Sequence, residues 1–124
     1  MNASLPIQYE WIKLNGYKEF TPWHFRNIEE YDSINKNFSI ENAQNRRVVT
    51  FANRQDNDDA AGFEVINGKV TDCVICFHPS YSGRKEKQII NSEHKNLFMF
   101  FREVVLVDFV EWGECEFGGD MWSN

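Results

Sequence analysis

The dipeptide Asn67-Gly68 most constrains how this chain can fold. It separates two runs rich in β-branched and apolar residues, Phe63 to Ile66 and Lys69 to His78. Asn-Gly readily adopts the positive φ angles of a tight turn whose twist matches that of two antiparallel strands. The sequence therefore predicts a β-hairpin here, and Pro79 should end its second strand because proline cannot donate to a ladder.

Further strands are predicted on both sides of this hairpin. Residues 46–53, RRVVTFAN, are β-branched and aromatic. Thr21 to Phe25 should be extended, because Pro22 disfavours the helical region at the residue before it. Ile89-Ile90 is a candidate for one more short strand.

Apolar residues at helical spacing predict a helix near each end of the chain. In residues 4–16, Leu5, Tyr9 and Ile12 recur at this spacing, and Asn15-Gly16 supplies a stop. A second helix is predicted to end at Gly113, and its apolar face would comprise Phe98, Phe101, Val105, Phe109 and Trp112. A short helix or turn is also possible around Ile28, Tyr31 and Ile34.

Together these elements predict one α+β domain over residues 1–124. We expect an antiparallel sheet of about four to six strands with helices covering one face. A chain of this length can bury a stable core without disulfides or a structural metal ion. Residues 113–124 are rich in glycine and acidic side chains, and we expect an irregular tail there.

The charge of the chain is concentrated at its C-terminal end. The formal net charge is −6, and residues 103–124 contain six acids and no Lys or Arg, so the preceding residues are balanced. This distribution disfavours nucleic acid as a partner, because the phosphate backbone requires basic side chains. It suits a basic partner, although an acidic end can also serve only to keep a protein in solution.

The sequence also bears on location. No uncharged apolar run reaches about 18 residues, so we expect no membrane partner. The first twenty residues carry four charged side chains and do not resemble a signal peptide. Three cysteines without framework spacing are typical of the reduced cytoplasm, where we expect this protein to act.

Two sets of side chains could carry chemistry, and neither forms a recognised catalytic pattern. Cys73 and Cys76 lie three apart in a predicted strand, so their side chains should point to opposite faces and not share a metal ion. His24, His78 and His94 are scattered, without a nucleophile motif. We therefore predict no enzyme activity, no metal and no cofactor.

The stretch RQDNDDAAGFEV, from Arg54 to Val65, holds three aspartates within four residues. A calcium loop starting at Asp56 would need an oxygen ligand, Gly and Glu at positions 5, 6 and 12, which here are Ala60, Ala61 and Asn67. Asp and Asn side chains commonly stabilise turns by bonding nearby backbone groups. We predict a turn that is stabilised by a structural polar cluster of Arg54, Asp56 and Asp59. The less favoured hypothesis is a metal-assisted hydrolase whose site would comprise Asp56, Asp58, Asp59 and His78.

Four segments resemble the SUKH superfamily, the cell-wall-assembly-regulator and toxin-immunity domain. They are LPIQY at Leu5–Tyr9, Pro22-Trp23, FANRQDNDDAAGFEV at Phe51–Val65, and FMFFREVVLVDFVEW at Phe98–Trp112 with Asp108 in its usual place. The third segment matches one bacterial branch most specifically, whereas Gly62 departs from it. The resemblance implies an α+β fold and either neutralisation of a partner toxin, often a nuclease, or a regulatory scaffold role.

These observations predict a non-catalytic module that binds a protein. The favoured hypothesis is an immunity protein that docks onto a basic, nuclease-type toxin, and the alternative is a regulatory scaffold without a toxin partner. An acidic surface would accelerate capture of a basic protein. The docking residues we expect are Asp58, Asp59, Glu111, Trp112, Glu114, Glu116, Asp120 and Trp122.

Overall fold

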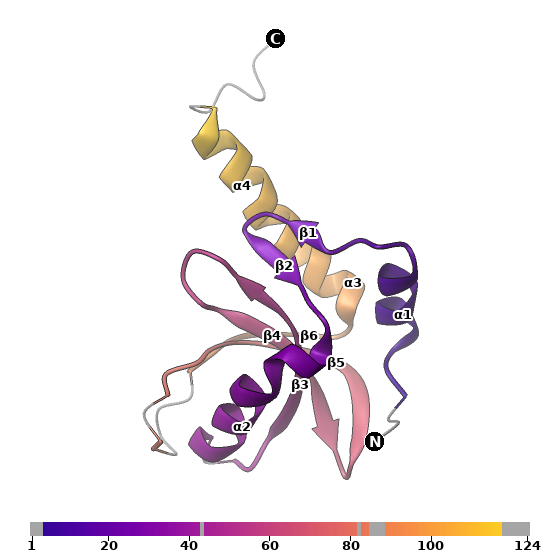
Figure 1. Cartoon of the computed structure of the whole chain (residues 1–124), viewed down its shortest axis with the longest axis vertical. Coiled ribbons are helices and arrows are strands. Elements are labelled where there is room, and N and C mark those ends of the chain that lie inside the picture. The colour runs from indigo at the N-terminus through magenta and orange to yellow at the C-terminus, as the bar shows by residue number, and fades with distance from the viewer. Residues whose placement is uncertain (1–3, 43, 82, 85–88, 118–124) are drawn as a thin grey trace.

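The computed structural model contains one six-stranded antiparallel sheet, and it describes residues 4–42, 44–81, 83–84 and 89–117. Strands lie in the sheet in the order of the sequence, each paired with the next, as Figure 1 shows. Their bounds are β1 (Glu19–Phe20), β2 (Trp23–Phe25), β3 (Arg47–Arg54), β4 (Ala60–Ile66), β5 (Lys69–His78) and β6 (Ile89–His94).

Three helical segments pack around this sheet. The first is α1 (Ile7–Leu14), and the second is the 3-10 turn η1 (Ile28–Tyr31) followed by α2 (Asp32–Glu41). The third is a continuous C-terminal helix made of α3 (Leu97–Phe100), the π-helical turn η3 (Phe101–Val105) and α4 (Leu106–Glu116). No helix in the described parts of the chain is long and apolar enough to span a bilayer.

The hairpin predicted at Asn67-Gly68 is confirmed. Ile66 pairs with Lys69 across the turn, and both turn residues have positive φ, 52° at Asn67 and 76° at Gly68. The predicted α+β class is confirmed with it, since five antiparallel pairings build a single sheet. Strands that follow each other in the sequence are neighbours in the sheet, including β2 and β3, whose connection contains η1 and α2.

Helices cover both faces of the sheet, whereas the sequence predicted one covered face. On β5, Val74 and Cys76 belong to the larger core, under α1 and α3, while Ile75 and Phe77 belong to a second core. In that second core Phe77 packs against Phe38 of α2, with ring centroids 4.7 Å apart. The physical reason is the continuous apolar run of β5, which demands cover on both sides.

The C-terminal helix buries only part of the predicted face. Val105 is buried and Phe101 packs against the core as predicted, whereas Phe98 and Phe109 are exposed. Leu97, Phe100 and Val104 also pack on the core, so the buried stripe keeps helical spacing but is rotated away from Phe98 and Phe109. The predicted stop at Gly113 is also wrong, because the helix continues to Glu116.

Close contact between β3 and β4 requires glycine at position 62. A Cβ atom there would lie 2.9 Å from both the Thr50 Cα and the Val49 carbonyl oxygen. Because these are backbone atoms of a central strand, relief would distort the ladder. Gly62→Ala should therefore lower the free energy of unfolding by about 1–3 kcal/mol, measured by urea denaturation.

The control for this prediction is Gly113→Ala, the same chemical change inside helix α4. Alanine has the higher helix propensity, so this variant should be as stable as the wild type or more so. Equal stability of Gly62→Ala and wild type would contradict the packing argument.

Candidate functional site

The base of α4 is fixed to the sheet by a polar network around Asp108. The buried Trp23 indole donates from Nε1 to Asp108 Oδ2 at 2.8 Å, and Arg54 Nη1 donates to the same oxygen at 3.1 Å. Trp23 lies on β2, Arg54 ends β3 and Asp108 lies in the first turn of α4. One carboxylate therefore ties two strands to the helix.

Arg54 also organises the acidic turn between β3 and β4. Its Nε and Nη2 atoms donate to Oδ1 and Oδ2 of Asp56, both at 2.8 Å. These hydrogen bonds hold the pKa of Asp56 below its usual value. The Arg54 backbone N–H donates to the Asp59 carbonyl at 2.7 Å and closes the turn. Arg54 thus joins the turn to the base of α4.

The three aspartates of this turn have separate environments. Asp59 contacts His78 Nδ1 at 2.8 Å rather than the Arg54 side chain, and Asp56 contacts Arg54. Asp58 is exposed and sits at a φ of 64°. The groups proposed for metal-assisted hydrolysis therefore do not converge on one ion, and Asp58 is the member of this turn most available to a partner.

Helix α4 leaves its apolar side chains partly exposed along its length. It contains no buried residue, and Leu106, Val107 and Phe109 are each close to half exposed. Figure 1 shows α4 extending away from the sheet. We call the helix surface from Leu106 to Glu116 the α4 surface.

Acidic side chains flank the apolar residues of the α4 surface. Glu111 and Glu116 are exposed, and Glu114 is half-buried. Trp112 Nε1 donates to Glu116 Oε1 at 2.8 Å, which fixes the indole along the helix. No Lys or Arg occurs between Glu103 and the end of the chain. The α4 surface is therefore apolar and uniformly negative.

The structure places only some of the predicted docking residues on one surface. Glu111, Trp112, Glu114 and Glu116 share α4, whereas Asp120 and Trp122 lie outside the described residues. Sequence reasoning missed Leu106 and Val107, because apolar residues in a helix were assigned to the core. The signal that could have identified them is the uninterrupted apolar run at residues 104–107, which is too wide for one buried stripe.

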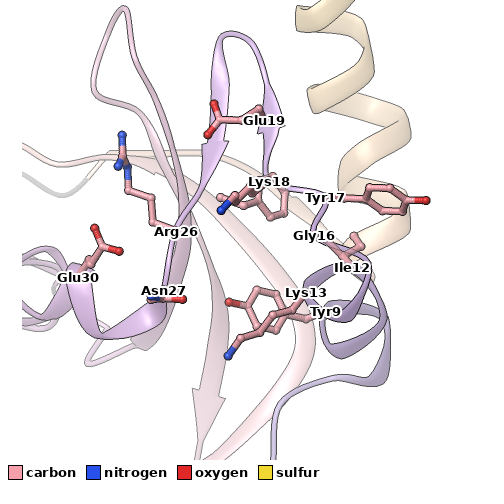
Figure 2. A pocket seen from close by; sticks show the side chains of 11 residues that line it. Tyr9, Ile12, Lys13, Gly16, Tyr17, Lys18, Glu19, Arg26, Asn27 and Glu30 are labelled. Atoms are coloured by element: carbon pink, nitrogen blue, oxygen red, sulfur yellow. The ribbon is translucent and has the colours of Figure 1, made fainter.

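A hollow of about 350 Å³ lies between α1, the β1–β2 hairpin and η1. Figure 2 shows the Tyr9 hydroxyl and the Lys18 ammonium directed into it, with Arg26 and Glu30 on its other side. Burial raises the pKa of Tyr9 to about 12, so the phenol stays protonated. None of the lining residues is a serine, cysteine or histidine, and the hollow therefore offers no nucleophile–base pair.

Three side chains from β4, β5 and β6 resemble a metal site, but the two carboxylates among them are already paired. Glu64, Cys73 and Glu93 lie together, but Arg46 donates to Glu64 Oε2 at 2.9 Å and to Glu93 Oε1 at 2.6 Å. The guanidinium thus occupies the place of a cation. Cys76 lies in the core, where burial raises its pKa to about 12.

One relay of side chains was not foreseen from the sequence. The buried His94 contacts Ser92 Oγ through Nε2 at 2.7 Å and Glu103 Oε1 through Nδ1 at 2.6 Å. The hollow in Figure 2 is not lined by any of these residues. The relay joins β6 to η3, and we assign it the role of positioning the C-terminal helix.

Comparisons with protein-family models, curated proteins and solved structures found no match to this chain. The functional argument consequently depends on the geometry described above.

The Asp108 network gives the first prediction for this region. Asp108→Ala leaves the Trp23 indole N–H buried without its acceptor, which should lower the free energy of unfolding by about 1–3 kcal/mol. Urea denaturation measures this change. Glu111→Ala, an acid-to-alanine change one turn further along α4, should alter stability by less than about 0.5 kcal/mol. Similar losses in both variants would contradict the proposed role of Asp108.

The pair formed by Arg54 and Asp56 gives a second prediction, on pH dependence. The hydrogen bonds from Arg54 lower the folded-state pKa of Asp56 below its usual value, so the stability they contribute is fully present above the unfolded-state pKa of about 4 and is lost as pH falls through the lower folded-state pKa. Asp56→Asn should therefore be less stable than wild type at pH 7, and the difference in stability should disappear once the pH is below the folded-state pKa of Asp56.

A double-mutant cycle tests whether Arg54 is the cause. In an Arg54→Gln background, Asp56→Asn should have little further effect on urea stability at pH 7, because its partner is gone. A full effect in that background would show that Asp56 stabilises the turn without Arg54.

Proposed function

We propose that this protein is a non-catalytic binding module that docks onto a basic protein through the α4 surface. The observation that carries the proposal is the exposure of Leu106, Val107 and Phe109 on a helix whose charged residues are all acidic. Exposed apolar groups of this extent mark contact sites, and an amphipathic helix commonly binds in an apolar groove of its partner. The proposed partner has such a groove with Lys and Arg at its rim.

The role proposed for this binding is immunity, in which docking neutralises a bacterial toxin. Supporting it are the resemblance of four segments to the SUKH superfamily and the acidic character of the α4 surface. Toxins that act on nucleic acid carry basic surfaces to bind phosphate, and an acidic helix would be steered toward them. Asp58, in the turn that Arg54 joins to the base of α4, can add to the same field.

Each class of side chain on α4 should contribute in its own way. Phe109 and Trp112 would be desolvated in the groove, so they should determine the dissociation rate. Glu111, Glu114 and Glu116 would remain at the rim and should determine the association rate and its salt dependence. These two contributions can be measured separately.

The test begins with a photo-crosslinking residue at position 109 in the native host, followed by identification of the captured protein. Binding kinetics are then measured with that protein at about 50 mM and 500 mM salt. The triple variant Glu111→Gln, Glu114→Gln, Glu116→Gln should associate about 10-fold more slowly at low salt and lose most of the salt dependence. Phe109→Ser should instead accelerate dissociation.

A matched control changes the same number of charges elsewhere. Glu29→Gln, Glu30→Gln and Asp32→Asn are exposed positions on η1 and α2 and should leave the kinetics unchanged. Equal kinetics for the α4 triple variant and this control would refute docking through α4. Tight binding to a protein whose expression does not inhibit growth would favour the regulatory scaffold over immunity.

A further inference from the structure

Helix α1 carries two apolar stripes on opposite sides, and the described fold covers only one of them. Tyr9 and Ile12 face the core and are buried. Ile7, Trp11 and Leu14, spaced four and three residues apart, remain 83%, 51% and 87% exposed. A single stripe suffices to hold a helix against one core, so apolar residues on both sides are typical of a helix covered on both.

The outer stripe of α1 is part of a larger apolar surface. The Trp11 ring packs edge-on against Tyr17 and Phe98, with centroid distances of 5.7 and 6.1 Å, and both neighbours are themselves exposed. In Figure 1, α1 lies at the outer edge of the molecule, on a different side from the free end of α4. We call Ile7, Trp11, Leu14, Tyr17 and Phe98 the α1 surface.

The charges beside the α1 surface are of both signs. An open hollow over the stripe is lined by Glu10 and Lys13 in addition to the apolar residues. Neither of these two side chains forms an ion pair within the described parts of the chain. On the helix they occupy the same flank of the stripe, one turn apart. This surface is therefore neutral, in contrast to the uniformly acidic α4 surface.

We propose that the α1 surface is covered by the α1 surface of a second copy of this chain. In an antiparallel pair of helices related by a two-fold axis, equal flanks lie side by side. Suppose that the two-fold axis passes between the helices at the level midway between Trp11 and Ile12. This level is also midway between Glu10 and Lys13. Glu10 of each copy then lies level with Lys13 of the other, and the two Trp11 side chains meet at the centre.

Charge decides which occupant fits this surface. A basic protein would gain nothing from a neutral surface and would be drawn to α4. Two copies of the α4 surface would repel each other, because both are acidic. An interface with two-fold symmetry brings the same surface of both copies together, so that surface must be complementary to itself. The α1 surface meets this requirement, because it is apolar and its two charges have opposite signs.

The size of the α1 surface sets the strength of this dimer. An apolar patch on one helix and its neighbours covers a few hundred Å². That is less than the roughly 800 Å² per partner of a standard stable interface. The dimer should consequently be weak and reversible, with a dissociation constant on the order of 10–100 µM.

Charge exchange at two positions tests the pairing directly. Sedimentation equilibrium from about 5 to 500 µM should show a monomer–dimer equilibrium for the wild type. Glu10→Lys places two lysines level with each other, and Lys13→Glu places two glutamates, so each single variant should associate at least about 10-fold more weakly. The two variants mixed in equal amounts should form a heterodimer with wild-type affinity, and the double variant Glu10→Lys, Lys13→Glu should recover it alone.

Control variants separate this interface from other changes. Lys36→Glu on α2 alters net charge as Lys13→Glu does and should leave the dimer intact. Ile7→Ser with Leu14→Ser should abolish the dimer without changing the melting temperature, because both side chains are exposed in the monomer. A monomer at every concentration, or a dimer that survives the single charge exchanges and is lost in Phe109→Ser, would overturn the proposal. The first result leaves docking of a basic partner by α4 untouched, whereas the second would place the α4 surface itself in the dimer.

Discussion

The arrangement of the C-terminal helix depends on one partly buried acceptor, the carboxylate of Asp108. It receives hydrogen bonds from the Trp23 indole on β2 and from Arg54 at the end of β3, and Arg54 also holds Asp56 in the following turn. A buried indole N–H without an acceptor is costly, so Trp23 can be fully buried only while α4 begins where it does. The same contact fixes the direction in which α4 leaves the domain, and thereby the position of every side chain on the α4 surface.

The parts of the fold that depend on local chemistry could be predicted from the sequence. Asn67-Gly68 specifies a hairpin by its backbone preferences, and Tyr9 with Ile12 identifies the buried side of α1 by spacing alone. The second core, around Phe38 and Phe77, was not predicted from the sequence. The four successive buried residues from Val74 to Phe77 already implied a strand covered on both sides, since an alternating strand would show polar residues among them.

The C-terminal helix shows what sequence periodicity cannot supply. Apolar residues are so frequent between Leu97 and Trp112 that two overlapping stripes fit a 3.6-residue period, and spacing alone does not say which of them is buried. Contacts with distant residues decide between the two stripes. His94 of β6 contacts Glu103, and Phe101 packs against Phe20 and Phe25 at centroid distances of 5.0 and 5.3 Å. These contacts exist only in the folded sheet, so helical spacing alone could not reveal that Phe109 would be exposed.

The two exposed apolar surfaces differ in charge, and this difference has a consequence for how they would act together. Dimerisation through the neutral α1 surface would leave each acidic α4 surface free, because the two lie on different sides of the molecule. A dimer would then present two docking helices to its surroundings. Against a monomeric partner this arrangement adds nothing to affinity. Against a partner with two or more basic sites it converts the second contact into an intramolecular one, which can raise the overall affinity by about 10²–10⁴-fold without any new contact. Even a weak α1 interface would therefore raise the affinity for such a partner, because it acts by increasing the local concentration of the α4 surface.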